Sequence, residues 1–369
     1  MARFGTAAAA TPVDVVVIGA GQAGLSAAYY LRKFGLRPEA GFVVLDRSFG
    51  PGGAWQHRWP SLTLSTVNGI HDLPGSSLAE VVGSTSGEVP AAAAVPEYYA
   101  DYEKRFELPV HRPVQVSVVC DRGDHLRVES DAGVYAARGL INATGTWEHP
   151  FVPWYPGTVR FRGRQMHTKD YRNAGELAGQ HVLVVGGGIS AVQLLDEISQ
   201  VTATTWVTRR EPAWREEEFT PELGRSAVAQ VEERVRQGLP PGSVTSVTGL
   251  PITPAIRAAR DRGVMRRLPM FSEITETGVQ WADGSILDVD VILWCTGFRS
   301  SLDHLAPLEL RNAGGGITLT GRLATQVEGD PRIHLVGYGP SASTIGANRA
   351  GRAAAREIID YLSAEANSR

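Results

Sequence analysis

Three glycines near the start of the chain have the types and spacing that bind a pyrophosphate. Gly19, Gly21 and Gly24 fit the pattern G-x-G-x-x-G directly after an apolar run. The first glycine permits a tight turn, the second lets the backbone approach the phosphates, and the third lets the next helix pack closely on the strand. Because free N–H groups at the start of that helix face the phosphates, this stretch predicts a dinucleotide site.

Two strands and a helix must position this turn. The run from Val15 to Ile18 is β-branched, too short for a helix that must bury itself, and ends at glycine, so it predicts a buried parallel strand. The next predicted strand, Phe42 to Leu45, ends at Asp46. A carboxylate there accepts hydrogen bonds from a ribose diol and repels a 2′-phosphate, which indicates FAD or NAD. A glycine turn that binds nothing is the alternative.

A second glycine turn lies in the middle of the chain. Gly186 and Gly188 follow another apolar strand, with Ala191 in place of the third glycine. The next predicted strand ends in Arg209 and Arg210 rather than in an acid. Guanidinium groups can grip a 2′-phosphate bidentately, so we expect NADPH here, with solvated surface arginines as the alternative. Two different dinucleotides in one chain imply that hydride passes from the nicotinamide to FAD in the first site.

Composition excludes several classes of protein. The chain has 369 residues and a formal net charge of −3, which gives no support for a nucleic-acid or membrane partner. Its two cysteines, Cys120 and Cys295, are far apart. Their separation excludes the dithiol chemistry of disulfide reductases and a zinc ribbon, and it fits a reducing cytosol. We therefore expect a cytoplasmic protein without a metal site.

The segment between the two glycine turns resembles a known family. Phe161, Gly163, His167 and Tyr171 fit F-x-G-x-x-x-H-x-x-x-Y, the identifying motif of class B flavin-dependent monooxygenases. The chain looks most like the compact bacterial flavin-containing monooxygenases, and the resemblance covers nearly its whole length. Baeyer–Villiger relatives typically carry Trp where this chain has Tyr171. The resemblance therefore favours oxygenation of a soft nitrogen or sulfur nucleophile over oxygenation of a ketone.

The resemblance also implies a fold and a reaction. The fold is α/β, with two Rossmann-like, three-layer ββα dinucleotide-binding domains of the glutathione-reductase-like type. The NADPH domain, residues 159–292 with a small lid or loop insertion, interrupts an FAD domain made of residues 1–158 and 293–369. In this family the reduced flavin captures dioxygen as a C4a-(hydro)peroxide, which oxygenates a small-molecule substrate.

Three points stay open at this stage. An NADPH oxidase or reductase that passes electrons to another acceptor would use the same cofactors. Baeyer–Villiger oxygenation of a ketone is a further alternative. Neither composition nor periodicity decides between a monomer and a homodimer.

Two residues are candidates for catalysis. Asn68 is the nearest counterpart of a family asparagine beside the oxygen-reacting edge of the flavin, although its neighbours differ from the usual pattern. His167 is a candidate acid or base, but a structural hydrogen-bonding role is favoured for a histidine at a domain junction. Trp55 and Trp59 can wall a dry pocket. Arg58 can approach the pyrophosphate or the isoalloxazine, or form a surface ion pair.

The predicted cofactor-binding residues are spread over both glycine turns and several loops. A helix that begins near Thr344 can direct its positive dipole end at the flavin pyrimidine. The full set is Gly19, Gly21, Gln22, Ala23, Gly24, Asp46, Arg47, Gly53, Trp55, Arg58, Trp59, Thr144, Gly145, Gly186, Gly188, Ile189, Ser190, Ala191, Arg209, Arg210, Thr296, Gly297, Ser343 and Thr344.

Overall fold

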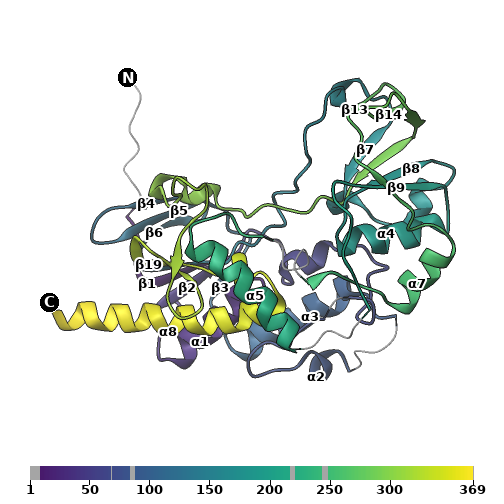
Figure 1. The fold of residues 1–369 in the computed structure, drawn as a ribbon. Helices are drawn as coiled ribbons and strands as arrows, with labels where there is room; N and C mark the ends of the chain where they lie inside the picture. The colour runs from purple at the N-terminus through teal and green to yellow at the C-terminus, as the bar shows by residue number, and fades with distance from the viewer. Residues whose placement is uncertain (1–8, 68, 84–87, 217–220, 243–247, 369) are drawn as a thin grey trace, which may run out of the picture.

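Two lobes, each built on a largely parallel sheet, are joined by two segments of the chain (Figure 1). The computed structural model describes residues 9–67, 69–83, 88–216, 221–242 and 248–368. We refer to the lobe that holds the start and the end of the chain as the first lobe. The second lobe is formed by residues from the middle of the chain.

The first lobe has, within the described residues, a nine-stranded sheet. Its strand order is β17-β18-β19-β6-β1-β2-β3, and β4 and β5 extend β6 as an antiparallel meander. The strands are β1 (Thr11–Ile18), β2 (Phe42–Leu45), β3 (Val110–His111), β4 (Val116–Asp121), β5 (Leu126–Ser130), β6 (Gly133–Asn142), β17 (Leu319–Thr320), β18 (Gln326–Val327) and β19 (Asp330–Leu335). The two predicted strands around the first glycine turn are therefore confirmed.

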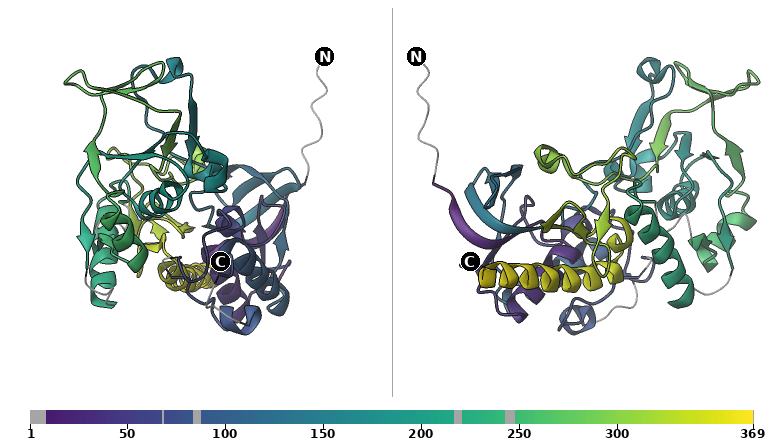
Figure 2. Two further views of the ribbon diagram at one scale, coloured as in Figure 1. Left: turned by 90° about the vertical axis from the view of Figure 1, so that its right-hand side faces the viewer. Right: turned by 60° about the vertical axis from the view of Figure 1, so that its left-hand side comes forward.

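Alternate residues of β1 face two different layers, as a buried parallel strand requires. Val15 and Val17 pack against α1 (Gln22–Lys33), α3 (Ala91–Arg105) and α8 (Thr344–Ser368). Val16 and Ile18 pack against the β4–β5 meander on the other face. Figure 2 shows α8 end-on in one view and along its full length in the other. This lobe therefore has three layers, one of helices, the parallel sheet, and one of antiparallel strands.

The second lobe repeats the same layering. Its described part holds a five-stranded parallel sheet in the order β12-β9-β8-β16-β7. Val182 and Val184 face the helices, while Leu183 and Val185 face a small antiparallel sheet. The elements are β7 (Arg164–His167), β8 (Val182–Val185), α4 (Ile189–Ser199), β9 (Thr204–Thr208), α7 (Pro254–Asp261), β12 (Arg267–Pro269), β13 (Glu273–Ile274), β14 (Gly278–Gln280), β15 (Ile286–Asp288) and β16 (Val291–Trp294). The expected boundary between residues 292 and 293 falls inside β16.

One helix leaves the second lobe and packs on the first. The chain departs after β10 (Trp214–Arg215) and returns at β11 (Leu250–Pro251), which pairs with β10 in parallel. Between them lies α5 (Pro221–Arg236), whose Val235 belongs to the apolar core of the first lobe. Arg236 also donates a hydrogen bond to the backbone carbonyl of Gly321 at 2.9 Å. A segment from the middle of the sequence therefore covers part of the first lobe.

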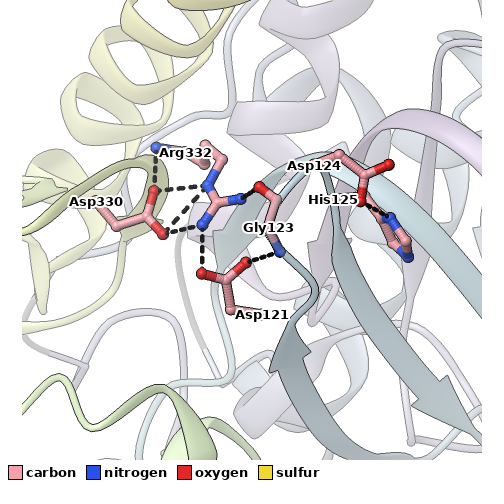
Figure 3. Close-up of polar contacts among 6 residues, drawn as sticks. All are labelled: Asp121, Gly123, Asp124, His125, Asp330 and Arg332. Carbon is pink, nitrogen blue, oxygen red and sulfur yellow. Dashed lines mark hydrogen bonds and ion pairs between the residues drawn. The ribbon is translucent and has the colours of Figure 1, made fainter.

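A cluster of ion pairs fastens the meander of the first lobe to its central sheet (Figure 3). Arg332 in β19 pairs with Asp330 at 2.7 Å and with Asp121 at 3.0 Å, and it donates to the carbonyl of Gly123 at 2.9 Å. The hydrogen bonds that Arg332 donates to the carboxylates of Asp330 and Asp121 raise the pKa of its guanidinium. This cluster is structural, since none of its members lines the cavity described next.

Candidate active site

A cavity of about 1120 Å³ opens at the carboxyl ends of β1, β2 and β6 and is lined by residues of both lobes. It is lined mainly by the first glycine turn, the loop after β2, the first segment between the lobes and the start of α8. The predicted site residues that line it are Gly19, Gly21, Gln22, Ala23, Asp46, Arg47, Gly53, Trp55, Arg58, Thr144, Gly145, Ile189, Ser343 and Thr344. Folding thus brings residues more than 300 positions apart to one space.

The first glycine turn has the shape that a pyrophosphate needs. Gly19 has a φ of +99°, and a Cβ on it would lie 2.6 Å from the carbonyl oxygen of Ala143. A Cβ on Gly24 would lie 1.8 Å from the carbonyl oxygen of Gly19, so the helix can approach the turn only because residue 24 is glycine. A Cβ on Gly21 would meet nothing within 4 Å. That open space at the N-terminus of α1 fits the phosphates of a dinucleotide.

Asp46 is held where a ribose would lie. Its side chain is buried, and its carboxylate accepts hydrogen bonds from the backbone N–H groups of Ala20 at 2.6 Å and Ser48 at 2.9 Å. Arg112 approaches the same carboxylate at 3.7 Å and is itself held by Glu103. These contacts fix the carboxylate at the end of β2, on the wall of the cavity.

The second glycine turn copies the first at two positions. Gly186 has a φ of +136°, and a Cβ on it would lie 2.3 Å from the carbonyl oxygen of Cys295. A Cβ on Gly188 would meet nothing within 4 Å. Ala191 is fully buried at the third position. Of this turn, Ile189 is the one predicted residue among the described cavity walls, so the second site faces the cavity at its edge.

The end of β9 presents two exposed guanidinium groups. Arg209 and Arg210 form no ion pair with a carboxylate in the described part of the chain. Arg267, which the sequence did not single out, lies beside them because β12 pairs with β9. It donates to the Thr208 hydroxyl at 2.7 Å and pairs with Glu211 at 2.8 Å. The exposed arginines are thus available to an anionic ligand, whereas Arg267 already has partners.

His167 serves the junction between the lobes. Its Nδ1 accepts a hydrogen bond from the backbone N–H of Lys169 at 3.1 Å, so Nε2 carries the proton and donates it to the carbonyl of Gly297 at 3.0 Å. Burial lowers the pKa of this histidine. His167 is buried and neutral, and both of its ring nitrogens form hydrogen bonds, so neither is free for proton transfer. Its role is to hold the second segment between the lobes in place. In the same segment, the Thr296 hydroxyl donates to the carbonyl of Phe151.

Two further predicted residues are not among the described walls of the cavity. Asn68 lies outside the described residues. Trp59 packs in the apolar core of the second lobe, where its ring meets Tyr171 edge-on at 6.3 Å. It is buried and is absent from the described cavity walls, whereas a pocket-wall role was expected. Its neighbour Trp55 does line the cavity.

Helix α5 supplies one wall of the cavity, within the region from Glu211 to Arg267 where pocket walls were expected. Five of its residues line the cavity, namely Gly224, Arg225, Val228, Ala229 and Glu232. Their separations of three and four residues place them on one face of the helix. The amphipathic pattern of this segment predicts a helix with two faces, but periodicity alone does not say which lobe the helix covers.

The chain is similar to several known oxidoreductases. The pyridine nucleotide-disulphide oxidoreductase family matches residues 16–329. A solved flavin-containing monooxygenase from Stenotrophomonas maltophilia is 36% identical, with a TM-score of 0.79 over 95% of this chain and 99% of that one. An uncharacterized oxidoreductase CzcO from Bacillus subtilis is 28% identical over 298 residues, 78% of this chain and 82% of that protein. An indole-3-pyruvate monooxygenase, YUCCA4 of Oryza sativa, is 28% identical over 81% of this chain and 80% of that protein.

These similarities agree with the two glycine turns, each with open space for a pyrophosphate. They confirm the predicted fold of two dinucleotide-binding domains, and FAD and NADPH are the cofactors. No helix in the described ranges is long and apolar enough to cross a bilayer. The chain belongs to the pyridine nucleotide-disulphide oxidoreductase family, and within it to the class B flavin monooxygenases.

Proposed function

We propose that this monooxygenase transfers one oxygen atom of dioxygen to the nitrogen or sulfur of a small, soft nucleophile. One NADPH and one proton are consumed, and the second oxygen atom leaves as water. When bound, FAD would supply the acceptor for the hydride of NADPH and the reduced ring that activates dioxygen. The remaining work, which is binding, orientation and exclusion of water, falls to the residues of this chain.

Tyr171 is the observation that carries the choice of substrate. Baeyer–Villiger relatives typically have Trp at this position. Tyr171 is buried, and its hydroxyl donates a hydrogen bond to Glu197 at 2.8 Å. Burial and the neighbouring carboxylate raise the pKa of this tyrosine, so the phenol stays neutral. The larger indole would have to displace close-packed core, which favours N- or S-oxygenation over ketone oxygenation.

Each cofactor has a separate set of candidate ligands. Gly21 and the start of α1 would hold the pyrophosphate of FAD, and the carboxylate of Asp46 would accept hydrogen bonds from the hydroxyls of its ribose. Gly188 and the start of α4 would hold the pyrophosphate of NADPH, and the exposed Arg209 and Arg210 would hold its 2′-phosphate. These assignments place the cofactors on opposite lobes, so the nicotinamide must meet the flavin at the boundary between the lobes.

The cavity walls suit a reaction that must be kept dry. Trp55 and the apolar side chains of α5 reduce the number of polar groups that face the flavin. Ser343 and Thr344 line the cavity at the N-terminus of α8, whose dipole favours negative charge there. The cavity slightly exceeds the ~300–1,000 Å³ of ordinary ligand sites.

Domain organisation and cell compartment belong to the same proposal. We assign residues 1–158 and 293–369 to FAD and residues 159–292 to NADPH, with α5 reaching across. Two distant cysteines fit a reducing cytosol. A homodimer is an additional proposal, and light scattering of the FAD-bound protein tests it.

Product analysis tests the substrate class. The FAD-bound protein is given NADPH, ¹⁸O₂ and, in turn, a dialkyl sulfide, a tertiary amine and a cyclic ketone. We expect a sulfoxide or an N-oxide that carries one ¹⁸O atom per NADPH consumed. Lactone formation as the main reaction would assign Baeyer–Villiger chemistry instead. Complete recovery of the NADPH electrons as hydrogen peroxide, or in an added quinone, would assign an oxidase or a reductase.

A further inference from the structure

Arg58 lies in the wall of the cavity, where the described residues supply no counterion for it. It follows the short 3₁₀ turn Gly53–His57, and its guanidinium carbon lies 4.9 Å from the ring centre of Trp147 and 5.7 Å from that of Trp55. Its Nε is buried and has no hydrogen-bond partner, and none of the described carboxylates forms an ion pair with this side chain. Stacking on aromatic faces stabilises a guanidinium but leaves its N–H edge free for a ligand.

The carboxylates that line the cavity are already engaged. Asp46 accepts hydrogen bonds from two backbone N–H groups. Glu148 pairs with Lys169 at 3.1 Å and with Arg47 at 3.4 Å. Glu232 pairs with Arg236 at 2.6 Å on the next turn of its own helix. Among the described walls no acid is left to neutralise the charge of Arg58.

The anionic groups of the two cofactors have other candidate partners. The FAD pyrophosphate is assigned to the open space at Gly21, and the NADPH pyrophosphate to the equivalent space at Gly188. Arg58 belongs to neither glycine turn. Trp147, on which it stacks, packs in turn on Phe298 at 5.1 Å. Trp147 and Phe298 lie on the two segments that join the lobes, so Arg58 faces the region where nicotinamide, flavin and substrate must meet.

Arg58 is half-buried, and a charge that is partly removed from water without a partner is costly unless a ligand of opposite charge compensates it. We propose that Arg58 binds a carboxylate carried by the substrate, so that the natural substrate is a thioether or amine with an acidic group. This inference rests on the proposed N- or S-oxygenation for the reacting atom. The carboxylate site itself stands on Arg58 and its surroundings and can be tested by binding alone.

A matched pair of probes tests the site. 3-(Methylthio)propanoate and 3-(methylthio)propanamide have the same number of heavy atoms and differ in charge. Each is titrated into the FAD-bound protein without NADPH, and binding is followed through the flavin absorbance. We expect the wild-type protein to bind the carboxylate at least about tenfold more tightly than the amide, as a charge-assisted hydrogen bond implies. Equal affinities in the wild type would overturn the proposal whatever the variants do.

Two variants place the preference on Arg58. R58Q should bring the two affinities within about twofold of each other, and R58K should retain part of the preference, because it keeps the charge but loses the planar fork. R322Q, at an exposed arginine of the first lobe, is the matched control and should leave the ratio as it is. An unchanged preference in R58Q would assign the carboxylate to another group and refute the site.

The other oxyanions near this site give different results. If Arg58 binds the NADPH pyrophosphate, R58Q will weaken the binding of NADP⁺ and leave the ratio of carboxylate to amide affinity unchanged. That result contradicts the proposal. If it holds FAD, R58Q will be isolated without flavin, which contradicts the proposal because the cofactor would then engage the guanidinium. The titrations need no turnover. A protein that binds the carboxylate but forms no sulfoxide would therefore refute the proposed reaction and keep the anion site.

Discussion

The two glycine turns of this molecule have the same geometry at their first two glycines and differ at the third position. In both turns the first glycine lies against a carbonyl that directly follows a neighbouring strand, that of Ala143 in the first lobe and that of Cys295 in the second. In both turns the second glycine faces open space. The shared geometry explains why one fold can serve two dinucleotides.

The third position separates the two turns. A methyl group on Gly24 would lie 1.8 Å from a backbone oxygen, whereas the second turn already holds a buried methyl at Ala191. The helix of the first lobe therefore stands closer to its turn than the helix of the second lobe does. The pattern G-x-G-x-x-G/A hides this difference, because the pattern accepts either residue at the third position.

Replacement of Gly24 should have the largest effect. G24A requires α1 to move away from the turn, so we expect protein that is poorly folded and that retains little FAD. G21A is the informative companion, because its methyl meets no protein atom and occupies the space given to the phosphates. That variant should fold and bind FAD weakly. Flavin absorbance per protein and the unfolding temperature measure both, and a flavin-replete G24A would show that the two turns are spaced alike.

The strands that follow the two glycine turns end at residues of opposite charge. Asp46 is buried and hydrogen-bonded to the backbone, while Arg209 and Arg210 are exposed. The paired replacement R209A/R210A should therefore lower kcat/KM for NADPH by about tenfold to a hundredfold and leave NADH nearly unchanged. R257A, at an exposed arginine of α7, is the control. Equal losses with both cofactors would mean that these arginines do not recognise the 2′-phosphate.

A histidine holds the exit of each sheet, and in the first lobe that histidine is His304. After β6, Asn142 accepts a hydrogen bond from His304 at 2.7 Å, and burial lowers the pKa of His304 to about 4. At the exit of β16, Thr168 donates to the carbonyl of Trp294 at 3.1 Å, and His167 donates to the carbonyl of Gly297 at 3.0 Å. Acid should therefore loosen the first lobe through this contact.

The sign of the pH effect follows from the lowered pKa of His304. Above pH 6.5 the imidazole of His304 is neutral in both the folded and the unfolded chain, and its contribution to stability is complete. As the pH falls toward 4 the unfolded chain binds a proton that the folded chain resists, and stability is lost, by at most about 3 kcal/mol. H304Q can still donate to Asn142, so its unfolding temperature should fall less between pH 7 and 4.5. H125Q, on the β4–β5 turn, controls for removal of a histidine, and parallel curves for H304Q and wild type would contradict this account.

The local features that distinguish the two turns could be predicted from the sequence. Both turns, their strands and the difference in charge are written within stretches of about 30 residues, where spacing and periodicity have direct geometric consequences. Asp46 is an example, because the strand that precedes it fixes the end of the sheet at which its carboxylate emerges.

Residues that depend on long-range packing were not predictable in the same way. The position of α5 follows from an excursion that begins and ends in the second lobe, and no local pattern shows that Val235 enters the core of the first. Arg267 reaches Thr208 only because β12 pairs with β9. Trp59 and Trp55 are four residues apart, yet one lies in a core and the other lines the cavity, since the chain turns between them.

The smallest expected effect completes the comparison of the two turns. A191G removes a buried methyl from α4 and adds glycine to a helix, which should cost about 1–2 kcal/mol of stability and lower the unfolding temperature by a few degrees. Because the methyl packs inside the lobe and the phosphate space lies at Gly188, the KM for NADPH should stay within about twofold of the wild-type value. Calorimetry and steady-state kinetics measure the two quantities. A tenfold rise in that KM would show that the methyl group of Ala191 contributes directly to cofactor binding. The second turn would then bind its dinucleotide differently from the first, and would not simply have a more distant helix.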